Sequence, residues 1–238
     1  MKFSLPIFLV LLTLIAPASR AGNFPEEVSV PLEKGFVPVG FDDNDNTQVM
    51  VAGTFSDTCH KVGPARVQVN SATGEIQIEQ LAYRYSDICL RMMVPFVNVI
   101  DLGILPAARY KIFDKMGKAE IAAMSVLVAK SSAADDFLYA PVADSDVVAS
   151  PDGKEHLLTL KGNFTNRCSA LKEVIVNRYA ETIVVQPIMT YTGEGRDCPY
   201  SKVRFQFSVP LKEKLTSAML LHVRVMNGKA VNKLVDVP

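Results

Sequence analysis

The stretch GTFSDTC at residues 53–59 returns as GNFTNRC at residues 162–168, and this recurrence decides the fold. The cysteine that ends each stretch is followed 30 positions later by another, at Cys89 and Cys198. All of these equivalences share one offset of 109 residues, which is close to half of the chain. Self-similarity at a fixed period indicates a structural unit that the chain contains twice.

Each copy consists of short runs in which apolar residues alternate with polar ones. Alternation with a period of two predicts strands that bury one face, and Asn227-Gly228 is a typical hairpin turn. About seven short strands in about 100 residues is the pattern of an antiparallel β-sandwich. The sequence therefore predicts an all-β chain of two tandem antiparallel, immunoglobulin-like β-sandwich domains, each with one intradomain disulfide. We expect repeat 1 at residues 22–131 and repeat 2 at residues 132–238, joined at an exposed seam at 131–136.

The first 21 residues have the composition of a signal peptide. A basic Lys2 precedes an apolar run at residues 7–15, and small residues lead to an expected cleavage site after Ala21. No later segment has the length of apolar sequence that a transmembrane helix needs. The formal net charge is zero, which argues against nucleic acid as a partner. We expect a secreted or periplasmic protein with no transmembrane helix after signal cleavage.

The four cysteines allow three pairings, and the repeat selects one of them. Equivalent positions in equivalent folds predict Cys59–Cys89 and Cys168–Cys198, and export supplies an oxidising compartment. The alternative is a redox or metal site, but the spacing contains no CxxC pattern. We therefore expect two structural disulfides.

The phrase DLGILPAARYKIF at residues 101–113 resembles the strand signature of bacterial immunoglobulin-like domains, in which a Leu-Pro turn leads to a strand headed by a tyrosine, here Tyr110. The second repeat lacks this Leu-Pro and this tyrosine. The chain as a whole is similar to uncharacterised secreted bacterial proteins with duplicated immunoglobulin-like β-sandwich repeats. This resemblance implies a fold and no activity.

A polar tract, FDDNDN at residues 41–46, precedes a predicted strand. Its D-x-N-D-N string resembles the calcium linker of cadherins, and that resemblance would make Asp42, Asn44, Asp45 and Asn46 oxygen ligands of a calcium ion. The alternative is a turn, because Asp and Asn side chains bond to nearby backbone and favour turns before strands. The second repeat does not preserve the tract, and both interpretations stay open.

Two tyrosines, Tyr83 and Tyr85, flank Arg84 near the end of a predicted strand. Alternation places both rings on one face, where aromatic residues beside an arginine can form a partner surface. The alternative is that the rings complete the core and leave their hydroxyls at its rim. The second repeat has Thr192 and Glu194 at these positions, so the pair is specific to repeat 1.

Catalytic motifs are not evident in the sequence. The three histidines, His60, His156 and His222, lie outside any recognised zinc or triad pattern, and we expect them at solvated or edge positions. The leading hypothesis is an exported non-catalytic binding, adhesion or envelope-scaffold protein that contacts a protein or another envelope component. The alternatives are a calcium-stabilised adhesion module and a hydrolase with an unrecognised site.

Overall fold

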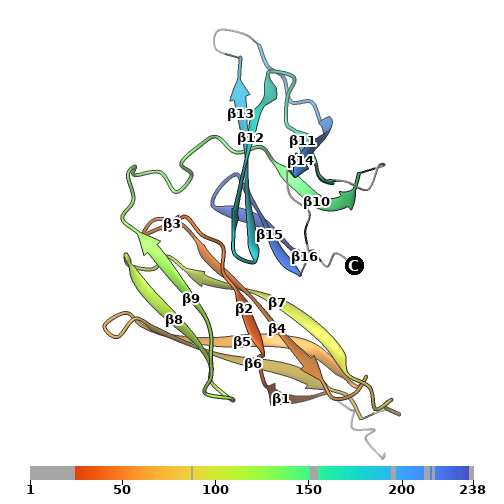
Figure 1. Cartoon of the computed structure of the whole chain (residues 1–238). Coiled ribbons are helices and arrows are strands. Elements are labelled where there is room, and N and C mark those ends of the chain that lie inside the picture. The colour runs from red at the N-terminus through yellow and green to blue at the C-terminus, as the bar shows by residue number, and fades with distance from the viewer. Residues whose placement is uncertain are drawn as a thin grey trace, which may run out of the picture.

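A computed structural model describes residues 25–86, 88–150, 155–193, 197–211, 215 and 218–235. The predicted signal peptide lies outside these residues. All regular elements in the described ranges are β-strands, so the all-β fold class is confirmed, and within these ranges no helix could span a membrane. Figure 1 shows a lower lobe built from the first half of the chain and an upper lobe built from the second half.

The first half forms two sheets that face each other. One has the order β1-β6-β8-β9-β3 with β5 also paired to β6, and the other has the order β2-β4-β7. The strands are β1 (Glu26–Val30), β2 (Lys34–Phe36), β3 (Phe41–Asp42), β4 (Thr47–Phe55), β5 (His60–Asn70), β6 (Glu75–Arg84), β7 (Val94–Gly103), β8 (Ala108–Asp114) and β9 (Glu120–Leu127).

The second half repeats this arrangement. Its sheets have the orders β12-β13-β15-β16 and β10-β11-β14. The first of these corresponds to β5-β6-β8-β9 of the first half, and the second corresponds to β2-β4-β7. The strands are β10 (Val142–Ala149), β11 (His156–Phe164), β12 (Ser169–Tyr179), β13 (Thr182–Tyr191), β14 (Val203–Leu211), β15 (Met219–Val225) and β16 (Lys229–Val235). Two tandem sandwiches are therefore confirmed, while the expected boundary between residues 131 and 132 stays a prediction.

The pairing is not antiparallel throughout, contrary to what the strand pattern predicts. β6 pairs with β8 in parallel, and β13 pairs with β15 in the same way. The strand between β6 and β8 is β7, which pairs with β4 in the opposite sheet. The chain therefore returns to the first sheet in its original direction, and a strand that crosses over in this way pairs in parallel.

Pro31 and Pro141 mark the point in each half where the opening segment changes sheets. β1 pairs with β6 before Pro31, and β2 pairs with β4 after it. In the second half, Tyr139 bridges to Ile188 before Pro141, and β10 pairs with β11 after it. Proline has no N–H to donate, so it suits the residue at which the ladder is interrupted.

Gly53 and Gly162 lie against these prolines, and neither position has room for a side chain. A Cβ on Gly53 would lie 2.7 Å from the Pro31 carbonyl oxygen and 2.7 Å from the ring of Phe96. A Cβ on Gly162 would lie 2.3 Å and 2.4 Å from the equivalent atoms of Pro141 and Phe205. The same aromatic pair packs beside each glycine: Phe55–Phe96 in the first half and Phe164–Phe205 in the second.

Each sandwich has its own apolar core. The first includes Val49, Ile78 and Ile112, and the second includes Leu158, Val185 and Leu221, all of which are buried. Tyr110 heads the inward side of β8, and its hydroxyl donates to the Pro106 carbonyl at 2.9 Å. This is the Leu-Pro-Tyr arrangement that the sequence predicts.

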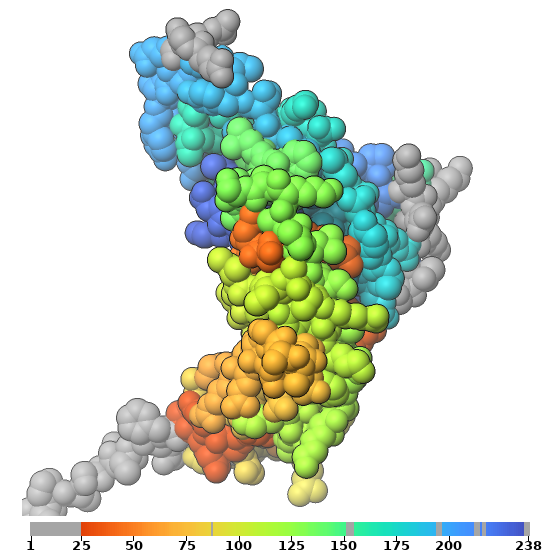
Figure 2. Space-filling model, turned by 90° about the vertical axis from the view of Figure 1, so that its left-hand side faces the viewer, coloured from red at the N-terminus to blue at the C-terminus, as the bar shows by residue number. Residues whose placement is uncertain are grey.

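The two halves pack against each other through the outer face of β15. Leu220 of β15 joins Phe36 of β2 and Met50 of β4 in a small apolar cluster. At its edge, Lys34 forms an ion pair with Glu181 at 2.6 Å. The space-filling view in Figure 2 shows the elongated molecule that results, with the first half forming one end.

Candidate functional site

The polar tract forms a turn between β3 and β4. The backbone N–H of Asp42 donates to the Asp45 carboxylate at 3.0 Å, and the N–H of Asn44 donates to the Asp42 carboxylate at 3.3 Å. The side chain of Asn44 donates to the Ser131 carbonyl at 2.8 Å, and that of Asn46 donates to Asp101 at 3.4 Å. These local bonds match the turn interpretation of the tract.

Arg224 of β15 is the cation that faces this turn. Its guanidinium lies 3.3 Å from the Asp45 carboxylate and 3.8 Å from that of Asp136, and it also donates to the Gly40 carbonyl. Its side chain and that of Asp45 are both largely buried. Burial raises the pKa of Asp45 above its usual value, although the charge of Arg224 acts in the opposite direction.

His222 lies beside Arg224 on the same face of β15. Its ring nitrogen Nδ1 is 2.7 Å from the Asn232 side-chain oxygen, and the Asn232 amide donates to Gln48 of the first half at 2.7 Å. Complete burial lowers the pKa of His222 to about 4, and the nearby Arg224 charge acts in the same direction. A chain of polar contacts therefore crosses from one half to the other.

The predicted calcium ligands lie together in the turn between β3 and β4, where the first half contacts β15 of the second half. Among the described residues, three His, Cys, Asp or Glu side chains converge at Asp57, Cys59 and Cys89, where the two cysteines are bonded to each other as a disulfide. Asp45 instead has Arg224 as its partner. Calcium binding by Asp42, Asn44, Asp45 and Asn46 stays a prediction.

The expectation of solvated or edge histidines is wrong for two of the three. His222 is buried because the first half covers the outer face of β15, and His156 is buried where it accepts the Leu215 N–H at 3.4 Å. His60 is partly covered and its Nδ1 lies 2.8 Å from the Asp57 carboxylate. Each of the three therefore has a partner within the fold.

Both predicted disulfides are present, Cys59–Cys89 in the first half and Cys168–Cys198 in the second. Cys59 lies in the connection from β4 to β5, and Cys168 lies in the equivalent connection from β11 to β12. A disulfide that closes a loop of this length stabilises the fold mainly by restricting the unfolded chain.

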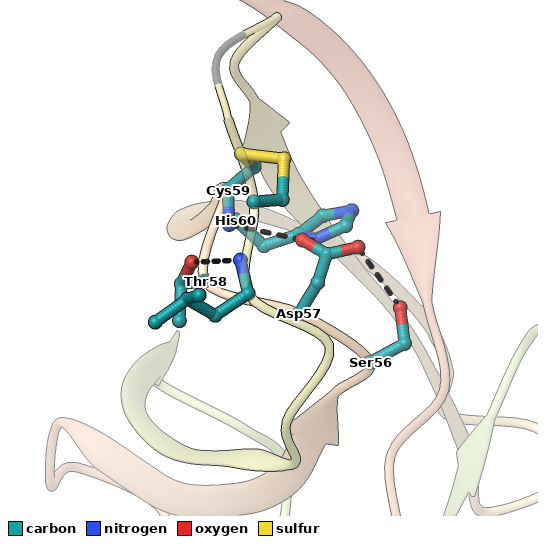
Figure 3. The surroundings of a disulfide bond; sticks show 7 residues. Ser56, Asp57, Thr58, Cys59 and His60 are labelled. Carbon is teal, nitrogen blue, oxygen red and sulfur yellow. Dashed lines mark hydrogen bonds and ion pairs between the residues drawn. A yellow bond between two sulfur atoms is a disulfide. The ribbon is translucent and has the colours of Figure 1, made fainter.

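The surroundings of the first disulfide are shown in Figure 3. The carboxylate of Asp57 accepts the Cys59 N–H at 2.9 Å and contacts the His60 ring, and the Ser56 hydroxyl donates to its other oxygen at 3.3 Å. The hydrogen bond from Cys59 holds the pKa of Asp57 below its usual value, and His60 adds to that effect.

The second half builds the same turn from neutral residues. Asn166 takes the place of Asp57 and accepts the Cys168 N–H at 3.0 Å, while the Ser169 hydroxyl donates to the same oxygen at 3.0 Å. Because Asn and Ser perform the same bonding there, the Asp57–His60 pair has a structural role at the start of β5.

Next to the first disulfide lies an exposed segment, ICLRMM at residues 88–93, which we call the apolar loop. Ile88 is 98% exposed, Leu90 64% and Met93 69%. Two bonds to Thr58 hold it in place: the Leu90 N–H donates to the Thr58 hydroxyl at 3.0 Å, and the Thr58 N–H donates to the Leu90 carbonyl at 3.1 Å. The scaffold thus holds exposed apolar side chains in a defined position.

The predicted tyrosine pair lies at the base of this loop. Tyr83 and Tyr85 are both half-buried, the Tyr85 N–H donates to the Cys59 carbonyl at 2.9 Å, and the Lys61 ammonium lies 5.0 Å from the centre of the Tyr85 ring. Whether these rings contact a partner stays a prediction. Sequence reasoning missed the loop itself, although four apolar side chains within six residues beside a predicted disulfide were a visible signal.

The comparisons with known proteins agree with the fold. A family model described as the ORF11 beta-sandwich domain matches residues 49–113, which run from β4 to β8 and include the first disulfide and the apolar loop. The chain is similar to that family over this stretch. Neither the curated proteins nor the solved structures contain a match to the chain.

Proposed function

We propose that the chain is an exported, non-catalytic binding protein that attaches to a component of the cell envelope through the apolar loop. The observation that carries this proposal is the difference between two equivalent loops. The first displays Ile88, Leu90, Met92 and Met93, whereas the second, DCPYSK at residues 197–202, is mainly polar. Burying exposed apolar surface is the main favourable term in most protein associations.

A purely structural role would not require apolar side chains at this place. The second loop closes an equivalent disulfide without them, so the scaffold does not need them for folding. An exposed apolar cluster also lowers solubility, which makes its presence informative about a binding role.

The contacts of the three histidines support a non-catalytic role. His60 contacts Asp57, His156 contacts the Leu215 backbone, and His222 contacts Asn232. These contacts explain the position of each histidine without a catalytic role. The two disulfides support export, because such bonds persist in oxidising compartments.

Capture of solubilised envelope material tests the proposal. We expect the wild-type chain to retain envelope components and the Leu90→Ser, Met93→Ser double variant to lose them. Tyr200→Ser is the matched control, because Tyr200 is 82% exposed in the second loop. Equal capture by all three proteins would contradict the proposal.

A further inference from the structure

Basic residues lie in the apolar loop and on the strands next to it. Arg91 lies within it, and Lys61 of β5 and Arg84 of β6 are exposed on the neighbouring strands. Acidic residues are present at this end as well: Glu26 is opposite Arg84 in the β1–β6 ladder, and Asp57 lies beside the first disulfide. An apolar cluster beside basic residues is the combination that peripheral proteins use on anionic lipid surfaces.

The shape of this end favours a flat partner. The apolar loop lies at the tip of the first half, on the side away from the second half, and the residues around position 90 project from the lower end of the molecule in Figure 2. A projecting tip can insert its side chains into a bilayer interface without any groove on the partner.

The chain enters the described structure at the same end. β1 begins at Glu26, which pairs with Arg84 at the end of β6, only a few residues before the apolar loop. The segment before β1 contains the apolar run that predicts a signal peptide. The apolar loop and the start of β1 therefore lie at the same end of the first half.

We infer that the apolar loop inserts into the interface of an anionic lipid bilayer. Ile88, Leu90, Met92 and Met93 enter the boundary between headgroups and acyl chains, while Arg91, Lys61 and Arg84 contact lipid phosphates. This inference rests on the proposed binding role of the loop and names its partner. Lysine and arginine bind phosphate as charge-assisted donors, so removing one lowers affinity without changing the apolar insertion.

The absence of tryptophan from the sequence provides a direct measurement. Leu90→Trp places a single indole in the apolar loop, and Tyr200→Trp places one in the second loop as a matched control. The probes are vesicles of phosphatidylcholine alone and vesicles of equal parts phosphatidylcholine and phosphatidylglycerol. Insertion moves the indole from water to an apolar medium, which shifts its emission to shorter wavelength.

We expect the emission of Leu90→Trp to shift on the anionic vesicles and that of Tyr200→Trp to stay unchanged. Co-sedimentation with the same vesicles should fall at least tenfold in the Leu90→Ser, Met93→Ser variant, as expected for two apolar side chains lost from a contact. In Arg91→Gln it should fall roughly fivefold, as expected for one basic residue at an anionic surface. Arg109→Gln, which alters an exposed arginine on β8, should bind as the wild type does.

The outcomes separate the two proposals. Loop-dependent capture of envelope protein without an emission shift or sedimentation on anionic vesicles would overturn the lipid inference and support the binding role. Failure of both envelope capture and vesicle binding would overturn both. Equal binding to vesicles with and without phosphatidylglycerol would overturn the assignment of the partner as an anionic bilayer.

Discussion

β8 of the first half and β15 of the second half occupy equivalent places, yet their outward side chains differ. Arg109 and Lys111 point to solvent on β8, whereas Leu220, His222 and Arg224 are buried on β15. The inward residues of both strands are core residues. The repeated scaffold therefore determines the inner face of the strand, and contact with the other half determines the outer face.

The loops that the two disulfides close also differ, but here the second half has the polar residues. Here it is the first half that carries the exposed apolar residues, and the second half that has the polar counterpart. The scaffold beneath both loops is the same: a side-chain oxygen of Asp57 or Asn166 caps the first cysteine of each disulfide. The two loops are equivalent in place, and of these two the one in the first half exposes an apolar cluster.

We expect the largest loss of unfolding free energy from Arg224→Ala. This change leaves the buried Asp45 carboxylate without its cation, which typically costs about 3–5 kcal/mol of unfolding free energy. Lys111→Ala is the matched control, because Lys111 forms an exposed pair with Glu120 that contributes about 0–1 kcal/mol. Urea unfolding measures the loss of unfolding free energy in both variants. Similar losses would contradict the buried environment of β15 and the exposed environment of β8.

Removal of either disulfide should have the next largest effect. Replacing both cysteines of one pair by alanine opens a loop with a sequence separation of 30, which costs roughly 3–4 kcal/mol in the chain-entropy model. Losses of similar size are expected in the two halves. Only the Cys59→Ala, Cys89→Ala variant should also lose envelope capture, and capture lost equally in both variants would argue against a binding role for the first loop alone.

The lowered pKa of His222 predicts that the folded chain loses stability as the pH falls. Its pKa is about 4 in the folded chain against 6.5 for the unfolded group, so between these values the unfolded chain binds a proton that the folded chain does not. Stability from this group is therefore lost as pH falls from 6.5 to about 4, by about 3 kcal/mol. Unfolding in this range should depend less on pH in His222→Gln.

The comparison of wild type with His222→Gln also removes the contribution of Asp45. Burial raises the pKa of Asp45, so the folded chain takes up that proton at a higher pH than the unfolded chain does. Its effect on stability has the opposite sign, with stability rising as pH falls. An identical pH dependence in the two proteins would contradict the assignment to His222.

We expect the smallest effect on stability from the addition or removal of calcium. Since Asp45 already has Arg224 as its partner and the tract forms its own turn bonds, we expect the same melting midpoint in EGTA and in millimolar calcium. A clear rise of the midpoint with calcium would show that the tract binds the ion, and Asp42→Asn should then abolish that rise.

The sequence predicts the parts of the fold that the repeat and local patterns encode. The equal cysteine spacing identifies both disulfides, and the period of two identifies β14 and most other strands. The parallel pairing of β6 with β8 could not be predicted in this way, because it depends on which sheet the intervening strand joins.

The candidate site is less accessible to sequence reasoning. The turn at Asp45 resembles a calcium linker only until Arg224, far along the chain, is known to lie against it. A weak signal for that contact exists in β15, where Met219, Leu220 and Leu221 are apolar in succession, as in a strand that is buried on both faces.

The central claim is that two equivalent scaffolds carry one binding loop, and exchanging the loop residues tests it most directly. Ile88→Asp, Leu90→Ser, Met92→Ser and Met93→Lys make the first loop polar. Asp197→Ile, Tyr200→Leu, Ser201→Met and Lys202→Met make the second loop apolar. Co-sedimentation with native envelope membranes should be lost when the first loop alone is changed and return when both loops are changed. Undiminished sedimentation after the first change would contradict the account.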